Sequence, residues 1–156
     1  MLAIIEDSSR HNLGHIERNI NIPTLALEIM HPRLRDQVTV RRSGTEVLEG
    51  RPGWLIEFRE QNILTLLRTP ERGDQPSRVV ALVDVETGEV LRTVLTWKYV
   101  EGSIAVTYGR APGISVPVPI RMDERYEIRT GEVVAGEATY TNFRQFETSA
   151  RIVPAR

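Results

Sequence analysis

The stretch RVVALVDVETGEVLRTVLTWKY, residues 78–99, decides the fold of this chain. Two runs rich in β-branched residues flank the turn ETGE at 86–89, where Gly88 can take the positive φ that a tight hairpin needs. Apolar residues occupy both faces of the run 79–85, which is typical of a strand in the middle of a sheet. One face of the second run carries Leu91, Thr93, Leu95, Trp97 and Tyr99. The stretch therefore predicts the central hairpin of an antiparallel sheet.

Alternation of apolar and polar residues continues on both sides of this hairpin, from 38 to 153. At this period successive side chains point to opposite faces of a strand, and the pattern predicts a meander of about nine strands. We expect a turn at Gly44, a strand at 63–69, a loop at 70–76, and closing strands at 132–146 and 148–153. Residues 116–128 alternate most cleanly, with Glu124 as the one charge in their apolar row.

Residues 21–31 predict a helix that is apolar nearly all round and therefore buried. Asn21 is a candidate cap, Pro23 suits the first turn, and Pro32 disfavours helical geometry at His31; residues 33–36 follow as a polar turn. The predicted fold is mostly β, of the α+β kind. It is an antiparallel curved sheet or half-barrel of about nine strands, with one or two helices on its concave face.

The chain of 156 residues predicts a single domain, 1–156, in which 1–20 reads as the remnant of a longer N-terminal region. A net charge of -1 and a pI near 6.3 disfavour nucleic-acid binding. The lack of cysteine excludes disulfides, thiol catalysis and cysteine-ligated zinc. No run reaches the ~20 apolar residues of a membrane span, and no signal peptide opens the sequence.

Candidate catalytic and metal-binding residues are few. His11 and His15, with Glu17 nearby, have the spacing of two metal ligands on one face of a helix. The alternative interpretation is that both histidines are simply solvated. The acidic residues 123, 124 and 127 fit a general acid/base pair. Because arginines at 121, 125 and 129 are interleaved with them, they also fit a row of solvated cross-strand ion pairs. For Glu124 we expect either a bulge or an arginine at the mouth of the concavity. The sequence predicts no enzyme, no metal and no cofactor.

Aromatic and large apolar residues of several predicted strands form the remaining candidate site. Their two interpretations are a plain core beneath the helix and an apolar groove for an acyl chain or similar ligand. The candidate lining residues are Trp54, Ile56, Phe58, Leu95, Trp97, Tyr99, Tyr108, Met122 and Tyr126.

Four segments resemble a family of uncharacterised secreted bacterial proteins: RNINIPTLAL at 18–27, VDVETGEVLRT at 83–93, VPVPIRMDERYE at 116–127 and ATYTNFRQF at 138–146. The order of strands and the hairpin at Asp84, Thr87 and Gly88 are more distantly similar to the half-barrel of periplasmic lipoprotein carriers and lipid-sensing regulators of envelope stress. That resemblance implies an open curved sheet and a lipid-like ligand, in a periplasmic or secreted setting if the chain is part of a longer exported protein.

Two functions are consistent with these observations. The first is non-catalytic binding of a lipid-like or other apolar ligand in the bacterial cell envelope. The second is a structural or protein-interaction module, with an envelope protein as partner and no small-molecule ligand. An interaction module should bury its aromatic face and expose an apolar edge or patch, whereas a ligand binder should keep a cavity on that face.

Overall fold

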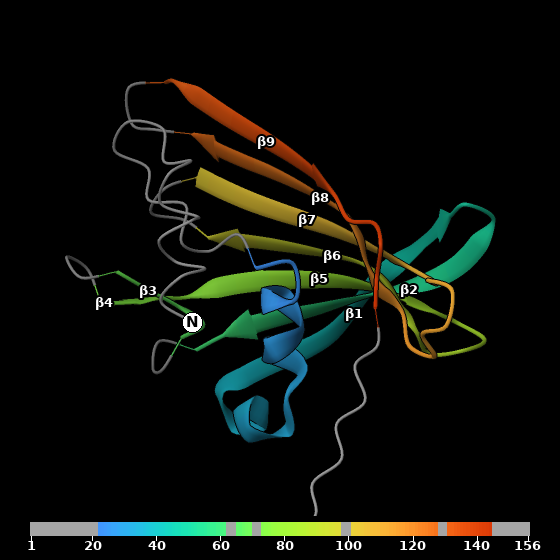
Figure 1. Cartoon of the computed structure of the whole chain (residues 1–156). Helices are drawn as coiled ribbons and strands as arrows, with labels where there is room; N and C mark the ends of the chain where they lie inside the picture. The colour runs from blue at the N-terminus through green and yellow to red at the C-terminus, as the bar shows by residue number, and fades with distance from the viewer. Residues whose placement is uncertain (1–21, 62–64, 70–72, 98–100, 128–130, 145–156) are drawn as a thin grey trace, which may run out of the picture.

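The computed structural model describes residues 22–61, 65–69, 73–97, 101–127 and 131–144 (Figure 1). Several sequence predictions fall outside these ranges and keep their status as predictions. They concern the N-terminal region 1–20, the cap at Asn21, the groove residue Tyr99 and the closing strand 148–153.

A seven-stranded antiparallel sheet forms the body of the protein, in the order β1-β2-β5-β6-β7-β8-β9. The sheet does not close, and strand accounts for 61% of the structure against 11% helix, which confirms the predicted mostly β fold. The strands are β1 Val38–Leu48, β2 Arg51–Glu60, β3 Leu67–Thr69, β4 Gly73–Gln75, β5 Ser77–Asp84, β6 Val90–Trp97, β7 Glu101–Gly109, β8 Val118–Glu127 and β9 Val133–Thr139.

The predicted central hairpin is confirmed as β5–β6, which lies in the middle of the sheet. Its turn is held by Asp84, whose Oδ1 accepts the backbone N–H of Glu86 at 2.9 Å and of Thr87 at 2.8 Å. Gly88 has φ of +72°, the left-handed conformation that the sequence assigned to it. The N–H of Gly88 donates to the carbonyl of Asp84 at 3.0 Å. The side chain of Asp84 thus fixes the turn from which the sheet extends.

The predicted turn at Gly44 is wrong. β1 runs without a break from Val38 to Leu48, and the register with β2 shifts between Arg42 and Gly44. One extra residue is absorbed there as a β-bulge, which adds local twist without reversing the chain. The chain instead reverses at Glu49 and Gly50, where φ is 50° and 81°.

The predicted strand at 63–69 and loop at 70–76 are also wrong in their bounds. Among the described residues of the predicted strand, only β3 is extended as a strand, and β4 falls inside the predicted loop; residues 63–64 and 70–72 lie outside the described ranges. The two short strands pair with each other as a separate two-stranded sheet. β9 likewise ends at Thr139, before the predicted end at 146, although residues 140–144 are described.

The predicted helix at 21–31 is present as a shorter 3₁₀ helix, η1 (Leu25–Met30), in which Ala26 and Ile29 are buried. It ends at His31, whose ψ of 133° confirms the break expected before Pro32. The predicted polar turn that follows is wrong, because a second 3₁₀ helix, η2 (Pro32–Gln37), occupies it. Pro32 fits the first turn of η2, and the His31 side chain accepts the backbone N–H of Arg33 at 3.2 Å.

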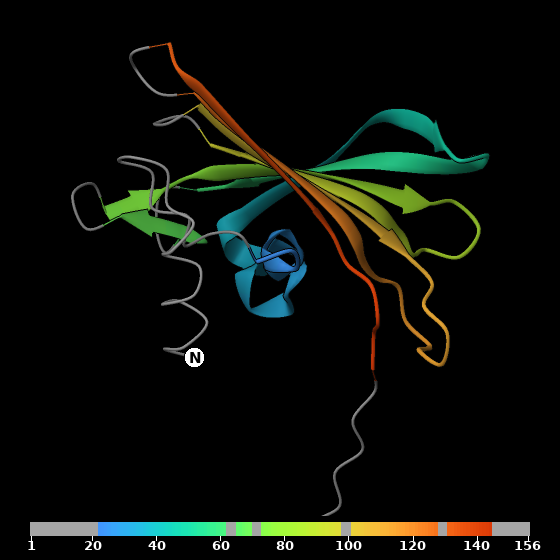
Figure 2. The same ribbon diagram turned by 45° about the horizontal axis from the view of Figure 1, so that its top comes forward.

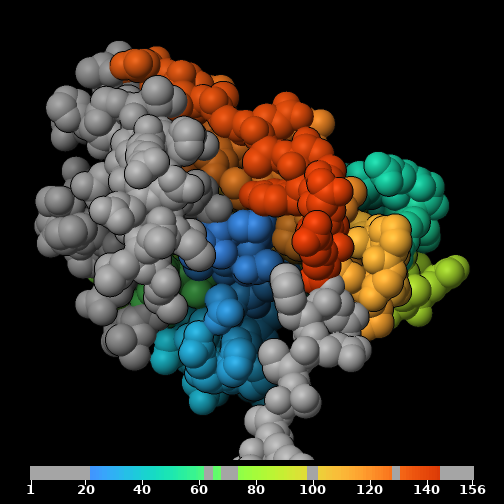
Figure 3. Space-filling model, viewed as in Figure 1, coloured from blue at the N-terminus to red at the C-terminus, as the bar shows by residue number. Residues whose placement is uncertain are grey.

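η1 lies across one face of the twisted sheet, which we call the inner face, and η2 lies beside it (Figure 2). We call the opposite face the outer face. In the space-filling view η1 (blue) lies between η2 (light blue) and the C-terminal part of the described chain (orange-red) (Figure 3). The buried residues that form the core around it are Ala26, Ile29, Val38, Val79, Leu95, Ile104, Val106, Tyr108 and Met122.

Candidate functional site

The described groove residues all lie on the inner side of their strands. Strand pairing aligns Ile56 in one row with Ala81, Thr93, Val106 and Met122. The next row aligns Phe58 with Val79, Leu95 and Ile104. The sequence pattern therefore assigned these residues to the correct face.

Their burial separates them into three groups. The fully buried ones are Leu95, Tyr108, Met122 and Tyr126. Ile56, Phe58 and Trp97 are half-buried, and Phe58 and Trp97 pack against the edge of the core. Trp54 is exposed, with the Arg42 guanidinium 5.4 Å from its ring centroid. The structure thus brings together the residues around β6 and β8, and leaves Trp54 apart.

Trp97 and Tyr126 form an aromatic pair at one end of the inner face, with ring centroids 5.9 Å apart and planes tilted by 58°. The indole lies directly over Gly102, which pairs with both residues in the sheet register. A side chain at Gly102 would overlap the indole, so this glycine is required for the packing of Trp97.

Tyr108 links the sheet to the segment that enters η1. Its hydroxyl donates to the carbonyl of Pro23 at 3.1 Å and hydrogen-bonds the Thr93 hydroxyl at 3.2 Å. Burial raises the pKa of this phenol above its usual range, so it stays protonated and able to donate. Tyr108 therefore holds η1 on the inner face.

Glu124 is a buried carboxylate on the inner face, aligned with Ile104 on β7 and Gly136 on β9. The register runs evenly through this position, which excludes the bulge, one of the two alternatives that the sequence left for Glu124. Burial, followed by the charge of Glu124, raises the pKa of Tyr140. A buried carboxylate is unusual and needs compensating polar contacts.

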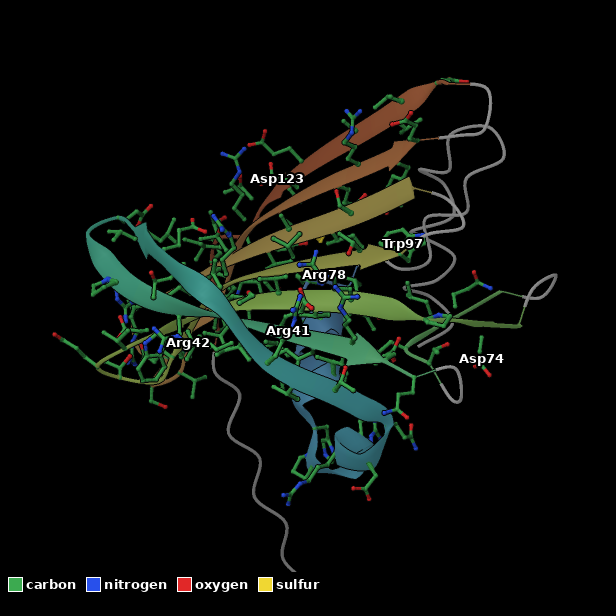
Figure 4. All side chains as sticks on the ribbon, turned by 180° about the vertical axis from the view of Figure 1, so that it is seen from behind. Arg41, Arg42, Asp74, Arg78, Trp97 and Asp123 are labelled. Carbon is green, nitrogen blue, oxygen red and sulfur yellow. The ribbon has the colours of Figure 1, made fainter. Side chains whose placement is uncertain are left out.

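The outer face carries a second buried carboxylate, Glu57, only 1% exposed. Its Oε1 accepts hydrogen bonds from the Nε–H of Arg41 at 2.8 Å and of Arg59 at 2.6 Å. Its Oε2 accepts a hydrogen bond from the Nε–H of Arg78 at 2.7 Å. Bonding by Arg41 and then by Arg59 outweighs burial and lowers the pKa of Glu57 to about 2. We call these four residues the Glu57 cluster; Arg41 and Arg78 lie side by side in the view from behind (Figure 4).

The sequence pattern did not reveal the Glu57 cluster. The four residues come from three strands, and only the register among β1, β2 and β5 brings them together. The predicted row of cross-strand ion pairs on β8 is confirmed only in part: Arg121 pairs across to Glu137 on β9 at 3.3 Å, whereas its pair with Asp123 at 2.9 Å and that of Arg125 with Glu127 at 3.6 Å lie within β8. Glu124 is buried on the opposite face.

We expect the protein to lose stability as the pH falls from about 4.5 toward 2. The pKa of Glu57 is lowered from 4.5 to about 2, and that of Asp84 from 3.8 to about 2, chiefly by the Thr87 backbone N–H. A carboxyl whose pKa is lower in the folded state stabilises the fold fully above its unfolded pKa and loses that effect as the pH falls through the folded pKa. Thermal unfolding between pH 7 and 2 measures this.

The matched control is Glu57→Gln, which should be less stable than the wild type at pH 7 and should lose less of its Tm between pH 4.5 and 2. An identical slope in both proteins would show that other carboxyl groups cause the acid transition.

Metal-binding and membrane-spanning features are absent from the described residues: they contain no group of three or more side chains able to hold a metal, and no helix long and apolar enough to cross a membrane. His11 and His15 lie outside them.

Comparison of the chain with protein-family models, curated proteins and solved structures gives no match. The fold and its two faces therefore define the class: an open antiparallel sheet with 3₁₀ helices on one face and arginine–carboxylate pairs on the other.

Proposed function

We propose that this chain is a non-catalytic binding module that holds an extended segment of a partner protein along the β1–β2 hairpin. One observation carries the proposal: Val40, Val47 and Trp54 are 59%, 65% and 40% exposed. We call these three residues the hairpin patch. Exposed apolar side chains gathered on one element mark a surface for interaction.

The hairpin patch lies on a single side of the hairpin. Val40 pairs with Phe58, Trp54 with Thr45, and Val47 with Pro52, which places all three on the inner side. η1 fills the middle of the inner face and leaves the three side chains of the hairpin patch exposed. An interaction module is expected to have a filled centre together with an exposed apolar rim.

β1 also offers backbone groups to a partner. It is the edge strand of the sheet, and among the described residues no strand pairs with its outer edge. An edge strand of eleven residues presents a row of N–H and C=O groups that an extended peptide can pair with. Arg42, over the ring of Trp54, adds a cation beside the hairpin patch. The partner segment that fits has alternating apolar side chains and an acidic residue.

Site-specific photo-crosslinking in the source cells tests this function. A crosslinking amino acid at Val47 should give one discrete product, and the same amino acid at Val116 should not. Val116 is the matched control because it is 59% exposed but lies outside the hairpin. Adding Thr45→Arg beside Trp54 should abolish the product. Equal crosslinking at both positions, or none at Val47, would overturn the proposal.

A second candidate function is the binding of an acyl chain or other apolar ligand at the Trp97 end of the inner face. Trp97 and Phe58 are only half-buried, although both are large and pack against the core. Aromatic side chains with accessible surface beside a core can line an apolar site. The sequence resemblance adds a bacterial envelope setting to both proposals.

A further inference from the structure

The Glu57 cluster has more positive charge than its carboxylate can balance. Arg41, Arg59 and Arg78 all bond to one buried group, so three cations surround a single anion. The cations themselves are accessible, with side chains that are 65%, 55% and 45% exposed. A structural ion pair needs only one arginine.

Three other arginines on this face, on β6 and β8, have carboxylate partners of their own. Arg92 bonds to Glu46 at 2.6 Å, and Arg125 to Glu127 at 3.6 Å. Arg121 contacts two carboxylates, Asp123 at 2.9 Å and Glu137 at 3.3 Å. Excess positive charge on this face is therefore concentrated at the Glu57 cluster.

The atoms used in these bonds leave donors free. Arg41 and Arg59 both reach Glu57 through Nε, and both bond to the same oxygen, so their guanidiniums lie side by side. Their Nη groups donate to no acceptor in the described part of the chain. Arg78 differs, because it uses Nε and Nη2 together on the other oxygen. Two neighbouring guanidiniums thus present paired Nη groups to solvent.

We propose that Arg41 and Arg59 bind a phosphate or sulfate group of a ligand on the outer face, with Glu57 as the positioning residue. Guanidinium groups bind such oxyanions through parallel N–H bonds. Glu57 holds the two side chains in place before the ligand arrives, which lowers the entropy cost of binding. This site is separate from the hairpin patch, because it lies on the opposite face of the sheet.

Isothermal titration calorimetry with inorganic pyrophosphate tests the site on the full chain. The double variant R41Q/R59Q should bind at least about tenfold more weakly than the wild type. It keeps the Arg78–Glu57 pair, and circular dichroism and Tm verify its fold. The control R121Q/R125Q removes the same charge from β8 on the same face and should bind as the wild type does. Equal loss in both variants, or no wild-type binding at millimolar pyrophosphate, would overturn the proposal.

A third variant separates a positioned site from plain charge attraction. Glu57→Gln makes the protein more positive, so charge attraction alone predicts tighter binding of pyrophosphate. A site that Glu57 positions predicts weaker binding. In NMR spectra, the Nε–H signals of Arg41 and Arg59 should then move to the chemical shifts of solvated arginines, because their bonds to Glu57 are lost. Tighter binding by this variant would contradict the proposal.

Vesicles distinguish the source of the oxyanion. We expect cosedimentation with phosphatidic acid vesicles, and none with phosphatidylcholine vesicles, if the group belongs to a lipid. If R41Q/R59Q no longer cosediments with phosphatidic acid vesicles, Arg41 and Arg59 bind the phosphate of a lipid headgroup. Binding of pyrophosphate without vesicles supports the site with a soluble ligand. Vesicle binding that R41Q/R59Q retains would contradict it.

Discussion

Leu95→Ala should lower the free energy of unfolding by about 2–5 kcal/mol, the usual cost of truncating a fully packed leucine. Leu95 is 1% exposed and lies between Val79 and Ile104 in the sheet register, in the core that η1 covers. The truncation removes apolar contacts on three sides, and the surrounding strands cannot move together to fill the cavity. Urea unfolding followed by tryptophan fluorescence measures the change.

Val94→Ala is the matched control. Val94 is the neighbour of Leu95 on β6, but it points to the outer face between Val80 and Ala105 and is only half-buried. Its truncation should cost about 1 kcal/mol, because little of the side chain is removed from water. A cost as large as that of Leu95→Ala would mean that the outer face is covered as thoroughly as the inner one.

The orientation of side chains could be predicted from the sequence because a strand has a local period of two. The alternation in β8 identified Met122 and Tyr126 as inner residues, and both are buried on the inner face. β5 shows the limit of the same rule. Its apolar residues on both sides predict two covered faces, and Leu82 on the outer side is indeed buried, although Val80 is half-buried.

Features that depend on pairing between distant residues were missed. In β1, Arg42 pairs with Ile56 and Gly44 pairs with the next residue of β2, Leu55, so one residue of β1 has no counterpart and forms the bulge. No local pattern in β1 reveals this shift of register. The Glu57 cluster joins Glu57 to Arg41, 16 residues away, and to Arg78, 21 residues away. Alternation assigns each residue to one side of its own strand, but it contains no information about register.

Gly102→Ala should lower the free energy of unfolding by about 1–3 kcal/mol, the usual cost of forcing extra atoms into a packed site. A Cβ on Gly102 would lie 2.6 Å from Cε2 and 2.8 Å from Cη2 of Trp97. The indole would have to leave its place beside Tyr126. In a Trp97→Ala background the same substitution should cost much less, since the overlapping ring is absent. Equal costs in both backgrounds would show that the strain lies in the backbone of β7.

The same tryptophan distinguishes a ligand site from plain core. Trp97→Ala alone should cost about 2–3 kcal/mol, less than the 3–5 kcal/mol of a fully packed aromatic, because Trp97 is only half-buried. If its accessible side receives an acyl chain, a fluorescent fatty acid should quench the emission of a Trp54→Phe variant, which keeps Trp97. The converse variant, Trp97→Phe, keeps only Trp54 and should show little quenching. A core-sized cost with no uptake of the fatty acid would leave the β1–β2 hairpin as the binding surface, because the Trp97 end would then be packed for stability alone.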